Sequence, residues 1–339
     1  MSVSHIFGST EPRYRSVTAS AHGKVNLHLG VGPAREDGYH ELDTIFQAVS
    51  LKEEVTVALK EGAPELCTWT VSGFDSHLVP QDFSNLAWKA VAEIQKLARH
   101  AHVPWAEVPV HIHIDKGIPV AGGMAGGSAD AAAALIAATE LYFPDPRSPR
   151  RPDSARLSEI AADLGADVPF CLLGGTARGT GKGENLMPVI ATGTYHWAIA
   201  TDKRGLSTPE VFKQLDQQRT TASTDSPRAA RAGSPDALIA ALRTGDPAEV
   251  GKFLVNDLQA PAISLLPSLR ETLTAADEAG AIAAIVSGSG PTVAMLCASA
   301  DDAVDVATAV SVAGKASSTM TTSSPAAAAG VIKREEIRE

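Results

Sequence analysis

The chain has 339 residues, of which 44% are hydrophobic and 20% are charged; this composition is typical of soluble globular proteins and argues against a disordered or fibrous chain. Acidic residues outnumber basic residues and give a net charge of −10, so we expect no nucleic-acid partner and no membrane partner. Three widely spaced cysteines exclude a disulfide framework, and no apolar stretch reaches the length of a membrane span, so the expected location is the cytoplasm.

The first half of the chain predicts an antiparallel sheet with helices packed on it. Residues 24–31 alternate polar and apolar side chains, which predicts a half-buried strand with Lys24, Asn26 and His28 on one face. Further strands are predicted over 42–51, 54–59 and 108–114, and helices over 85–101 and 129–142. His111 and His113 share a strand face, but no third ligand is evident nearby, so we favour a polar strand face over a metal site.

The second half continues with helices and short strands. Helices are predicted over 154–164, 237–243, 264–279 and 301–312, and strands over 176–178, 196–201, 281–286 and 293–297. Residues 217–235 have almost no large apolar side chain and are predicted to be a mobile surface insertion without chemistry. Residues 332–339 are charged and are predicted to be a solvated, disordered tail.

A glycine-rich loop from Pro119 to Ser128 runs straight into the helix predicted over 129–142. Backbone amides at such a loop, followed by the positive end of a helix dipole, suit a di- or triphosphate, although a plain turn can have the same composition. The loop has neither the G-x-G-x-x-G spacing of dinucleotide folds nor the Gly-Lys-[Ser/Thr] ending of a P-loop. A third kind of phosphate loop is therefore predicted.

Three segments in this order resemble the three motifs of the GHMP small-molecule kinases: Lys24-Val25-Asn26-Leu27, Pro119 through Ser128 with its helix, and Ser287-Gly288-Ser289-Gly290-Pro291-Thr292. Four further segments resemble the members of that superfamily that phosphorylate a hydroxyl of a cytidine-diphosphate sugar alcohol on the non-mevalonate route to isoprenoid precursors. They are Gly38-Tyr39-His40, Leu164 to Phe170, Thr208 to Phe212, and Asn256-Asp257-Leu258. The resemblance covers roughly residues 16–298.

The resemblance implies an α+β fold with two domains and an active site in the cleft between them. The expected N-terminal domain, residues 1–193, is of the ribosomal-protein-S5-like kind and contains the glycine-rich loop. The expected C-terminal domain, residues 194–339, is ferredoxin-like.

The resemblance also implies ATP and Mg²⁺ as cofactors. The expected ATP-binding residues are Pro119, Val120, Ala121, Gly122, Gly123, Met124, Ala125, Gly126, Gly127, Ser128, Asn85 and Lys116. For Asn85 and Lys116 the alternatives are a helix cap and a solvated lysine, and Ser128 is the loop hydroxyl placed to assist the metal. Ala121 and Ala125 stand where family members commonly have glycine, so a methyl group obstructs backbone approach at these points.

Lys24 and Asp167 are the catalytic pair that the resemblance implies. Phosphoryl transfer is catalysed mainly by positioning and by neutralising charge, so a lysine beside an aspartate at the acceptor hydroxyl is a sensible minimal site. Asp167 either accepts the hydroxyl proton or orients the hydroxyl, and both roles stay open.

The substrate end of the site also follows from the resemblance. Tyr39 and Phe212 are expected to enclose the base, because the face of a pyrimidine has no hydrogen-bonding groups. His40 and Asn26 are expected to supply polar contacts, and Thr208 to lie near the sugar alcohol or its diphosphate. Without the resemblance, Tyr39 would be read as a loop residue and Phe212 as a core residue.

Two other functions stay open. One is a related kinase with another acceptor, such as homoserine or mevalonate, which would offer Tyr39, His40 and Phe212 no base to stack on. The other is a nucleotide-binding sensor without catalysis, which would need neither Lys24 nor Asp167. The expected partners are the small-molecule substrate and ATP, with at most a weak homodimer.

Overall fold

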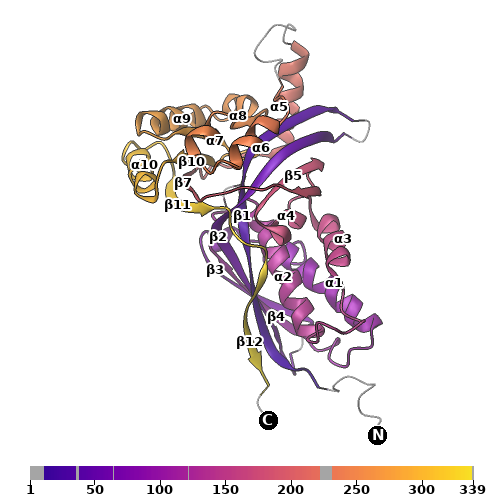
Figure 1. The fold of residues 1–339 in the computed structure, drawn as a ribbon. Coiled ribbons are helices and arrows are strands. Elements are labelled where there is room, and N and C mark those ends of the chain that lie inside the picture. Colours follow the sequence, from indigo (N-terminus) through magenta and orange to yellow (C-terminus); the bar gives the residue numbers. More distant parts are fainter. Residues whose placement is uncertain (1–10, 36–37, 64, 121, 222–230, 338–339) are drawn as a thin grey trace.

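Two sheets and their covering helices make up the computed structural model, which describes residues 11–35, 38–63, 65–120, 122–221 and 231–337. Figure 1 shows an elongated molecule in which β1 and β2 of the first sheet reach from one end to the other, while the strands β7, β10 and β11 of the second sheet lie toward the end that carries α5 to α10. The strands are β1 (Tyr14–Ala34), β2 (His40–Leu59), β3 (Cys67–Gly73), β4 (Val110–Lys116), β5 (Thr176–Gly181), β6 (Asn185–Pro188), β7 (Tyr195–Thr201), β8 (Val255–Asn256), β9 (Ala283–Val286), β10 (Val293–Cys297), β11 (Ser318–Ser324) and β12 (Gly330–Glu336). The helices are η2 (Ser76–Leu78), α1 (Leu86–His100), α2 (Gly126–Tyr142), α3 (Ser154–Leu164), α4 (Val168–Leu173), α5 (Thr208–Thr221), α6 (Asp236–Leu242), α7 (Pro247–Gly251), α8 (Gln259–Leu265), α9 (Ser268–Glu278) and α10 (Ala300–Val312).

The first sheet has the strand order β12-β1-β2-β4-β3, with β5 and β6 continuing from β2 and β8 pairing with β1. Helices α1 to α4 cover one of its faces (Figure 1). Helix α2 is buried nearly all round, because its run from Ala129 to Leu135 consists of small or apolar side chains apart from Asp130. Small side chains let this helix pack closely on the sheet and on α1.

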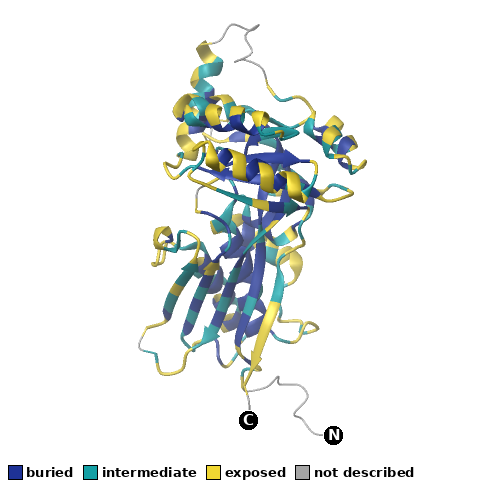
Figure 2. Cartoon of the chain, turned by 90° about the vertical axis from the view of Figure 1, so that its left-hand side faces the viewer, coloured by how far each residue is buried: buried dark blue, intermediate teal, exposed yellow. Residues whose placement is uncertain are grey.

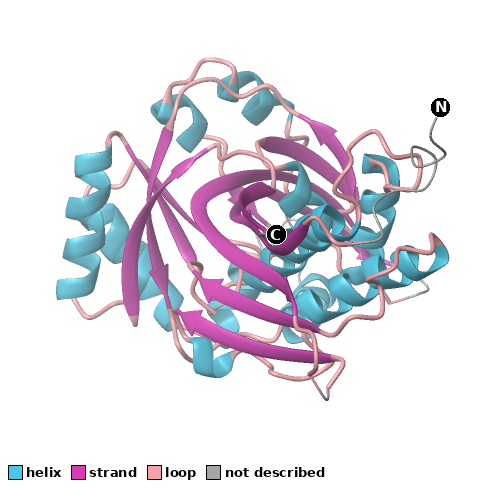
Figure 3. Ribbon diagram, turned by 90° about the horizontal axis from the view of Figure 1, so that it is seen from below, coloured by secondary structure: helices cyan, strands magenta, loops and turns pink. Residues whose placement is uncertain are grey.

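The second sheet has the strand order β11-β7-β10-β9. Its elements follow one another as a strand, helices, two strands, a helix and a strand, which is the βαββαβ succession of ferredoxin-like folds. Seen from below, the helices lie at the outer sides of the molecule and the strands between them (Figure 3). The expected α+β fold is confirmed, and Figure 2 shows the buried residues concentrated along the strands.

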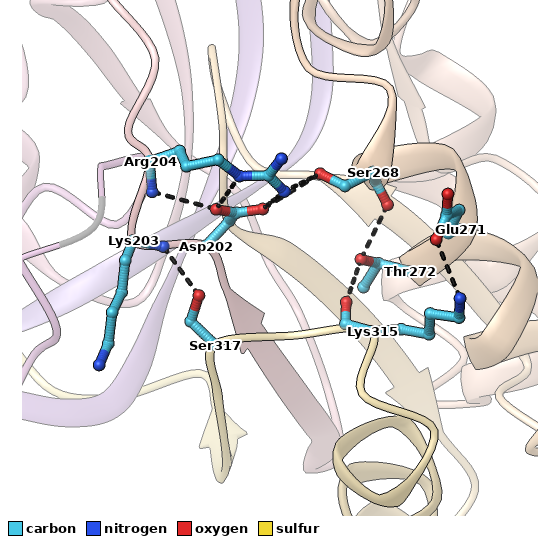
Figure 4. Close-up of polar contacts among 8 residues, drawn as sticks. All are labelled: Asp202, Lys203, Arg204, Ser268, Glu271, Thr272, Lys315 and Ser317. Carbon is cyan, nitrogen blue, oxygen red and sulfur yellow. Dashed lines mark hydrogen bonds and ion pairs between the residues drawn. The ribbon is translucent and has the colours of Figure 1, made fainter.

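Polar contacts join the end of β7 to α9 and to the segment before β11 (Figure 4). The carboxylate of Asp202 accepts hydrogen bonds from Arg204 and Ser268. These bonds, of which the Arg204 side-chain bond is the strongest influence, lower the pKa of Asp202. The hydroxyl of Thr272 donates to the backbone carbonyl of Lys315. Side-chain hydrogen bonds therefore hold the end of β7 and the segment before β11 to α9.

The structure corrects two predicted boundaries. The strands predicted over 42–51 and 54–59 form one strand, β2, because the polar residue Glu53 between them is buried and bonded rather than part of a turn. The helix predicted over 264–279 is two helices, α8 and α9, because Pro267 precedes Ser268 and interrupts the helix.

Two segments that were predicted to lack regular structure contribute residues to a helix and to a strand. Of the predicted insertion 217–235, the first residues complete α5 and the stretch 222–230 lies outside the described residues. The prediction that this segment is mobile is wrong for Arg219, whose guanidinium forms a 2.9 Å ion pair with the largely buried side chain of Asp257. Residues 332–336 of the predicted disordered tail instead belong to β12, which pairs antiparallel with β1.

Strands from both sides of the predicted domain boundary near residue 193 pair within the first sheet. The boundary itself stays a prediction. Both β8 and β12 lie beyond that residue in sequence, and both pair with β1. The first sheet therefore takes in segments from the C-terminal half. Among the described helices, none combines the length and the apolar character that crossing a bilayer requires.

Truncation of the chain after residue 329 tests whether β12 contributes to stability. We expect a loss of about 2 kcal/mol, because the deletion removes the strand pairing to β1 and the Arg334 side chain that lies 2.8 Å from the partly buried carboxylate of Glu140. Thermal unfolding measures this effect. Truncation after Glu336 is the control and should leave the melting temperature unchanged, and equal melting of the two truncations would contradict a structural role for β12.

Candidate active site

A pocket of about 520 Å³ collects most of the predicted site residues, and its volume is typical of small-molecule sites. The predicted residues that line it are Lys24, Asn26, Asn85, Lys116, Pro119, Val120, Gly122, Gly123, Met124, Ala125, Gly126, Gly127, Ser128, Asp167, Thr208 and Phe212. Tyr39 and His40 lie next to this lining rather than in it, and Ala121 lies outside the described residues. The structure thus brings together segments that are far apart in the sequence.

The glycine-rich loop is held by hydroxyl groups of the segment between β9 and β10. Ser287 Oγ donates to the carbonyl of Gly123 at 2.8 Å, and Thr292 Oγ1 donates to the carbonyl of Gly122 at 2.6 Å. Both glycines have positive φ angles, and a Cβ on Gly123 would lie 2.5 Å from the Ser287 carbonyl oxygen. Glycine is therefore required at this position for both backbone conformation and space.

The loop ends at the N-terminus of α2, where an anion can bind. Ala125 is the N-cap residue and has no side-chain oxygen, so no cap bond satisfies the first amides of the helix. These amides, at Gly126 to Ser128, border the pocket together with the positive end of the helix dipole. Ala125 has a φ of 61°, in the left-handed region, which explains why glycine suits this position.

Lys24 and Asp167 lie next to the loop and face each other. Lys24 Nζ is 3.6 Å from Asp167 Oδ2, and the lysine is buried whereas the aspartate side chain is 33% exposed. The backbone amide of Lys24 donates to the carbonyl of Met124, which fixes the lysine against the loop. Asp167 precedes α4 and makes no side-chain cap bond there, so its carboxylate faces the pocket with an oxygen available to a hydroxyl group.

Asn26 is hydrogen-bonded to Lys24. Its Oδ1 accepts a 2.7 Å hydrogen bond from Lys24 Nζ, and its Nδ2 donates to Thr44 Oγ1 at 2.9 Å. Thr44 in turn donates to the carbonyl of His28. This chain of bonds fixes the orientation of the Asn26 amide and, through it, the position of the Lys24 ammonium group. Irregularities in the β1–β2 pairing on either side of Lys24 and Asn26 help to aim both side chains.

Lys116 is part of a buried acid–lysine triad. Its Nζ lies 2.7 Å from Glu53 Oε1 and 2.6 Å from Asp130 Oδ2, and all three side chains are almost fully buried. Burial, followed by the negative charge of Asp130, raises the pKa of Glu53 to about 8, and burial also raises the pKa of Asp130. Two carboxylates with one ammonium would carry a net negative charge, so the triad retains a proton near neutral pH. The alternative of a solvated lysine at position 116 is wrong.

The triad lies directly behind the anion site. A Cβ on Gly126, the first residue of α2, would be 3.1 Å from Glu53 Oε1 and 3.5 Å from Lys116 Nζ. The triad therefore joins β2, β4 and α2 at the point where the helix begins.

Thr208 and Phe212 of α5 also line the pocket, and the segment around residue 40 packs against Phe212. The rings of His40 and Phe212 lie 5.0 Å apart, and His40 Nε2 is 2.9 Å from Asp216 Oδ1. Thr208 shares a hydrogen bond with Ser289. Tyr39 is 54% exposed, and the ammonium of Lys182 lies 3.5 Å from the centroid of its ring. In this part of the site each aromatic ring therefore lies beside a polar or charged side chain: Phe212 beside His40, and Tyr39 beside Lys182.

Two remaining predicted residues have simple structural roles. Asn85 is the N-cap of α1, accepts a hydrogen bond from the Ala87 amide and also borders the pocket, so the cap and the pocket wall are the same residue. Ser128 is half-buried in the first turn of α2 and lines the pocket. Within the described part of the chain, no group of three or more His, Cys, Asp or Glu side chains could hold a metal ion. His111 and His113 hydrogen-bond to threonine hydroxyls of β3.

Several residues of the site were missed by the sequence analysis. Asp130 and Lys182 border the pocket, Glu53 pairs with the lining residue Lys116, and Asp216 bonds to His40 next to the lining. Glu53 and Lys182 stand in polar stretches without a motif, and Asp216 is one of several polar residues of α5. Asp130 offered a signal, since a carboxylate stands within an alanine-rich helix that is otherwise apolar.

Comparison with known proteins identifies relatives over the whole chain. Family models described as "GHMP kinases N terminal domain" and "GHMP kinases C terminal" match residues 85–175 and 238–316. A curated 4-diphosphocytidyl-2-C-methyl-D-erythritol kinase from Corynebacterium jeikeium is 84% identical over all of both chains. The enzyme of that name from Nocardia farcinica is 51% identical over 94% of this chain and 97% of the relative.

Solved structures agree with these relatives. A crystal structure of 4-(cytidine 5'-diphospho)-2C-methyl-D-erythritol kinase has a TM-score of 0.67 and 30% identity, covering 90% of this chain and 98% of that chain. The L. major mevalonate kinase in complex with R-mevalonate has a TM-score of 0.71 at 14% identity, covering 94% and 100%, which shows the fold alone.

A matched pair of substitutions tests the loop geometry. Gly123→Ala is expected to lower the free energy of unfolding by about 2 kcal/mol or more, because the new methyl group meets the Ser287 carbonyl in a left-handed backbone. Ala125→Gly relieves the strain of a left-handed alanine but raises the conformational entropy of the unfolded chain. Because these effects oppose each other, we expect the free energy of unfolding to change by less than about 1 kcal/mol. Denaturant unfolding of both variants measures these effects, and a similar loss in both would contradict the interpretation.

The triad predicts a pH-dependent component of stability. Because the pKa of Glu53 is raised from 4.5 to about 8, the folded protein binds more protons than the unfolded chain between these values. The triad's contribution to the free energy of unfolding therefore falls as pH rises from about 4.5 to about 8, by at most about 1.4 kcal/mol per pH unit.

Asp130→Asn should flatten this fall, because the substitution leaves one carboxylate for one ammonium. Urea unfolding of the wild type and the variant at pH 5, 6, 7 and 8 measures the difference between them. Asp115→Asn, at an exposed position, is the control. Parallel pH profiles for the wild type and Asp130→Asn would show that the triad does not retain a proton.

Proposed function

The chain belongs to the 4-diphosphocytidyl-2-C-methyl-D-erythritol kinases, a branch of the GHMP kinases, and from this membership we infer that it transfers a phosphoryl group from ATP to the 2-hydroxyl of 4-diphosphocytidyl-2-C-methyl-D-erythritol. The reaction is a step of the non-mevalonate route to isoprenoid precursors. The observation that carries the inference is the 84% identity over the full length of a curated kinase. The pocket supplies the chemical parts that this reaction needs.

We propose that the triphosphate of ATP lies along the glycine-rich loop and at the N-terminus of α2. The uncapped amides at Gly126 to Ser128 and the helix dipole stabilise negative charge there, and the loop itself is fixed by Ser287 and Thr292. Because these donors are in place before the nucleotide binds, they stabilise charge in the transition state without reorganisation.

We propose that Mg²⁺ accompanies the nucleotide, where it would neutralise charge on the phosphates. The hydroxyl-bearing side chain of Ser128, in the first turn of α2 and in the pocket lining, fits such a role as one oxygen ligand beside phosphate oxygens and water. The lack of a carboxylate cluster among the described residues fits a metal held mainly by the nucleotide.

The acceptor hydroxyl is proposed to lie between Asp167 and Lys24. Asp167 accepts a hydrogen bond from the hydroxyl, which directs an oxygen lone pair at the γ-phosphoryl group. Lys24, fixed by Asn26, keeps positive charge beside both the carboxylate and the transferring group. Because the transition state of phosphoryl transfer is loose, this arrangement works whether Asp167 accepts the proton early or late.

The cytidine end is proposed to lie against Phe212, with Tyr39 as the second aromatic side chain. The interaction of His40 with both Phe212 and Asp216 holds this end in place. Neither homoserine nor mevalonate has a base that could use these rings. Cytoplasmic location and a weak homodimer stay predictions from the sequence.

An acceptor panel tests the function. A coupled ADP-release assay with ATP and magnesium should give turnover with 4-diphosphocytidyl-2-C-methyl-D-erythritol and none above background with homoserine, mevalonate or galactose. Turnover with another acceptor would keep a kinase but discard the cytidine site at Tyr39, His40 and Phe212. Binding of ATP without turnover of any acceptor would favour a nucleotide sensor.

Substitutions of the catalytic pair test their roles. Asp167→Asn and Lys24→Met are each expected to lower kcat by about 10²- to 10⁴-fold, because both remove charge at the reacting hydroxyl. The dissociation constant of ATP, measured by calorimetry, should change less than about threefold in Asp167→Asn. Asp163→Asn, on the exposed side of α3, is the matched control. Wild-type kcat in Asp167→Asn would remove Asp167 from the mechanism.

A further inference from the structure

The positive charges that border the pocket differ in how they are neutralised. Of the described residues, three lysines line it: Lys24, Lys116 and Lys182. Lys24 faces Asp167, and Lys116 lies between the two carboxylates of the triad. Lys182 forms no ion pair with a carboxylate of the described chain. Its charge is therefore available to a ligand in a way that the other two are not.

Lys182 lies on a fixed turn between β5 and β6. The amide of Gly181 donates to Glu41 Oε1, and the amide of Lys182 itself donates to Glu184 Oε2. Gly181 and Gly183 both have positive φ angles, and a Cβ on Gly183 would lie 3.3 Å from the ring of Phe46. The turn is packed tightly against the sheet, so the lysine side chain is the part that can move.

The ammonium of Lys182 rests on an aromatic ring of the substrate end. Its Nζ lies 3.5 Å from the centroid of Tyr39, a cation–π contact. Cytosine stacking on the same ring face would displace the ammonium. Because the lysine stem is long and flexible, the charge then moves from the ring to whatever lies beside the base in the pocket.

The proposed substrate has a diphosphate at that place. Chemically, the diphosphate joins the cytidine, proposed to lie against Phe212 and Tyr39, to the sugar alcohol, proposed to lie at Asp167 and Lys24. It is anionic, and the protein as a whole has a net charge of −10, so the diphosphate needs a local cation. Lys24 and Lys116 have their charges offset by carboxylates, which leaves Lys182.

We propose that Lys182 is a specificity-determining residue that binds the diphosphate of the acceptor substrate. When the base stacks on Tyr39, the Lys182 ammonium leaves the Tyr39 ring and binds the diphosphate instead. This proposal rests on the proposed function. It assigns the kinase a means of recognising a nucleoside diphosphate derivative over the free nucleoside, because only the former has an anion for the ammonium group. A salt-dependent affinity follows, since the contact is partly exposed to solvent.

Lys182→Met tests the charge, because methionine keeps much of the stem and removes the ammonium. The readouts are the KM for the cytidyl substrate, the KM for ATP, and direct binding of CDP and of cytidine by calorimetry at 50 and 500 mM salt. We expect CDP binding and the substrate KM to weaken about tenfold at low salt, as for a lost charge-assisted hydrogen bond. Cytidine binding should change less than about twofold, and high salt should reduce the CDP effect.

Two further variants complete the test. Lys182→Arg keeps the charge and should stay within about threefold of the wild type for CDP. Lys252→Met removes an exposed lysine that is paired with Glu249 outside the pocket and should change none of the constants.

The outcomes separate the alternatives. Equal weakening of CDP and cytidine would place Lys182 at the base or ribose, and unchanged CDP binding would remove it from the site; either result overturns the proposal. An equal increase of the KM for ATP would show a general effect on the pocket and would also overturn it. Failure of the wild type to phosphorylate the cytidyl substrate would instead contradict the proposed function, because CDP binding is measured without turnover.

Discussion

The ammonium of Lys116 at the end of β4 lies between a carboxylate of β2 and a carboxylate of α2, and the beginning of α2 depends on that contact. Charges buried this deeply are tolerated only when they are paired, and removal of the Lys116 ammonium would leave two buried carboxylates without a countercharge. Because Glu53, Lys116 and Asp130 come from three elements, the pairing fixes the helix N-terminus relative to the sheet. The uncapped first turn of α2, which borders the pocket, is thereby preorganised.

The C-terminal half contributes to the same site by holding the loop from the other side. Hydroxyls of Ser287 and Thr292 bond to loop carbonyls, and the Asn256 amide bonds to the carbonyls of Val286 and Gly288. Asp257, the next residue, pairs with Arg219 of α5. Asn256 and Asp257 therefore connect two parts of the pocket wall. One is the segment between β9 and β10, which holds the loop, and the other is α5, which carries Phe212.

The arrangement of charge along the pocket fits a kinase that works by positioning. The uncapped amides of α2, the pair of Lys24 and Asp167, and the ring of Phe212 all border the same pocket. Each lysine has a different environment: one faces a partly exposed aspartate, one is enclosed by the triad, and Lys182 rests on a ring. Phosphoryl transfer requires charge in fixed places more than it requires a strong base.

Sequence alone determined the local elements and the motifs, because side-chain periodicity and glycine spacing are local properties. It predicted α3 over 154–164, which the structure confirms, and it singled out the glycine-rich loop and Lys24 with Asp167, which line one pocket. It missed β12, because the charged side chains of this segment are typical of a solvated tail. The strand forms by pairing with β1, which lies more than 300 residues away in the sequence. Only the tertiary structure decided that Glu53, Lys116 and Asp130 form one unit and that Lys182 meets Tyr39. A charged side chain is compatible with solvent or with a buried partner, and its partners become known only when distant segments are placed side by side.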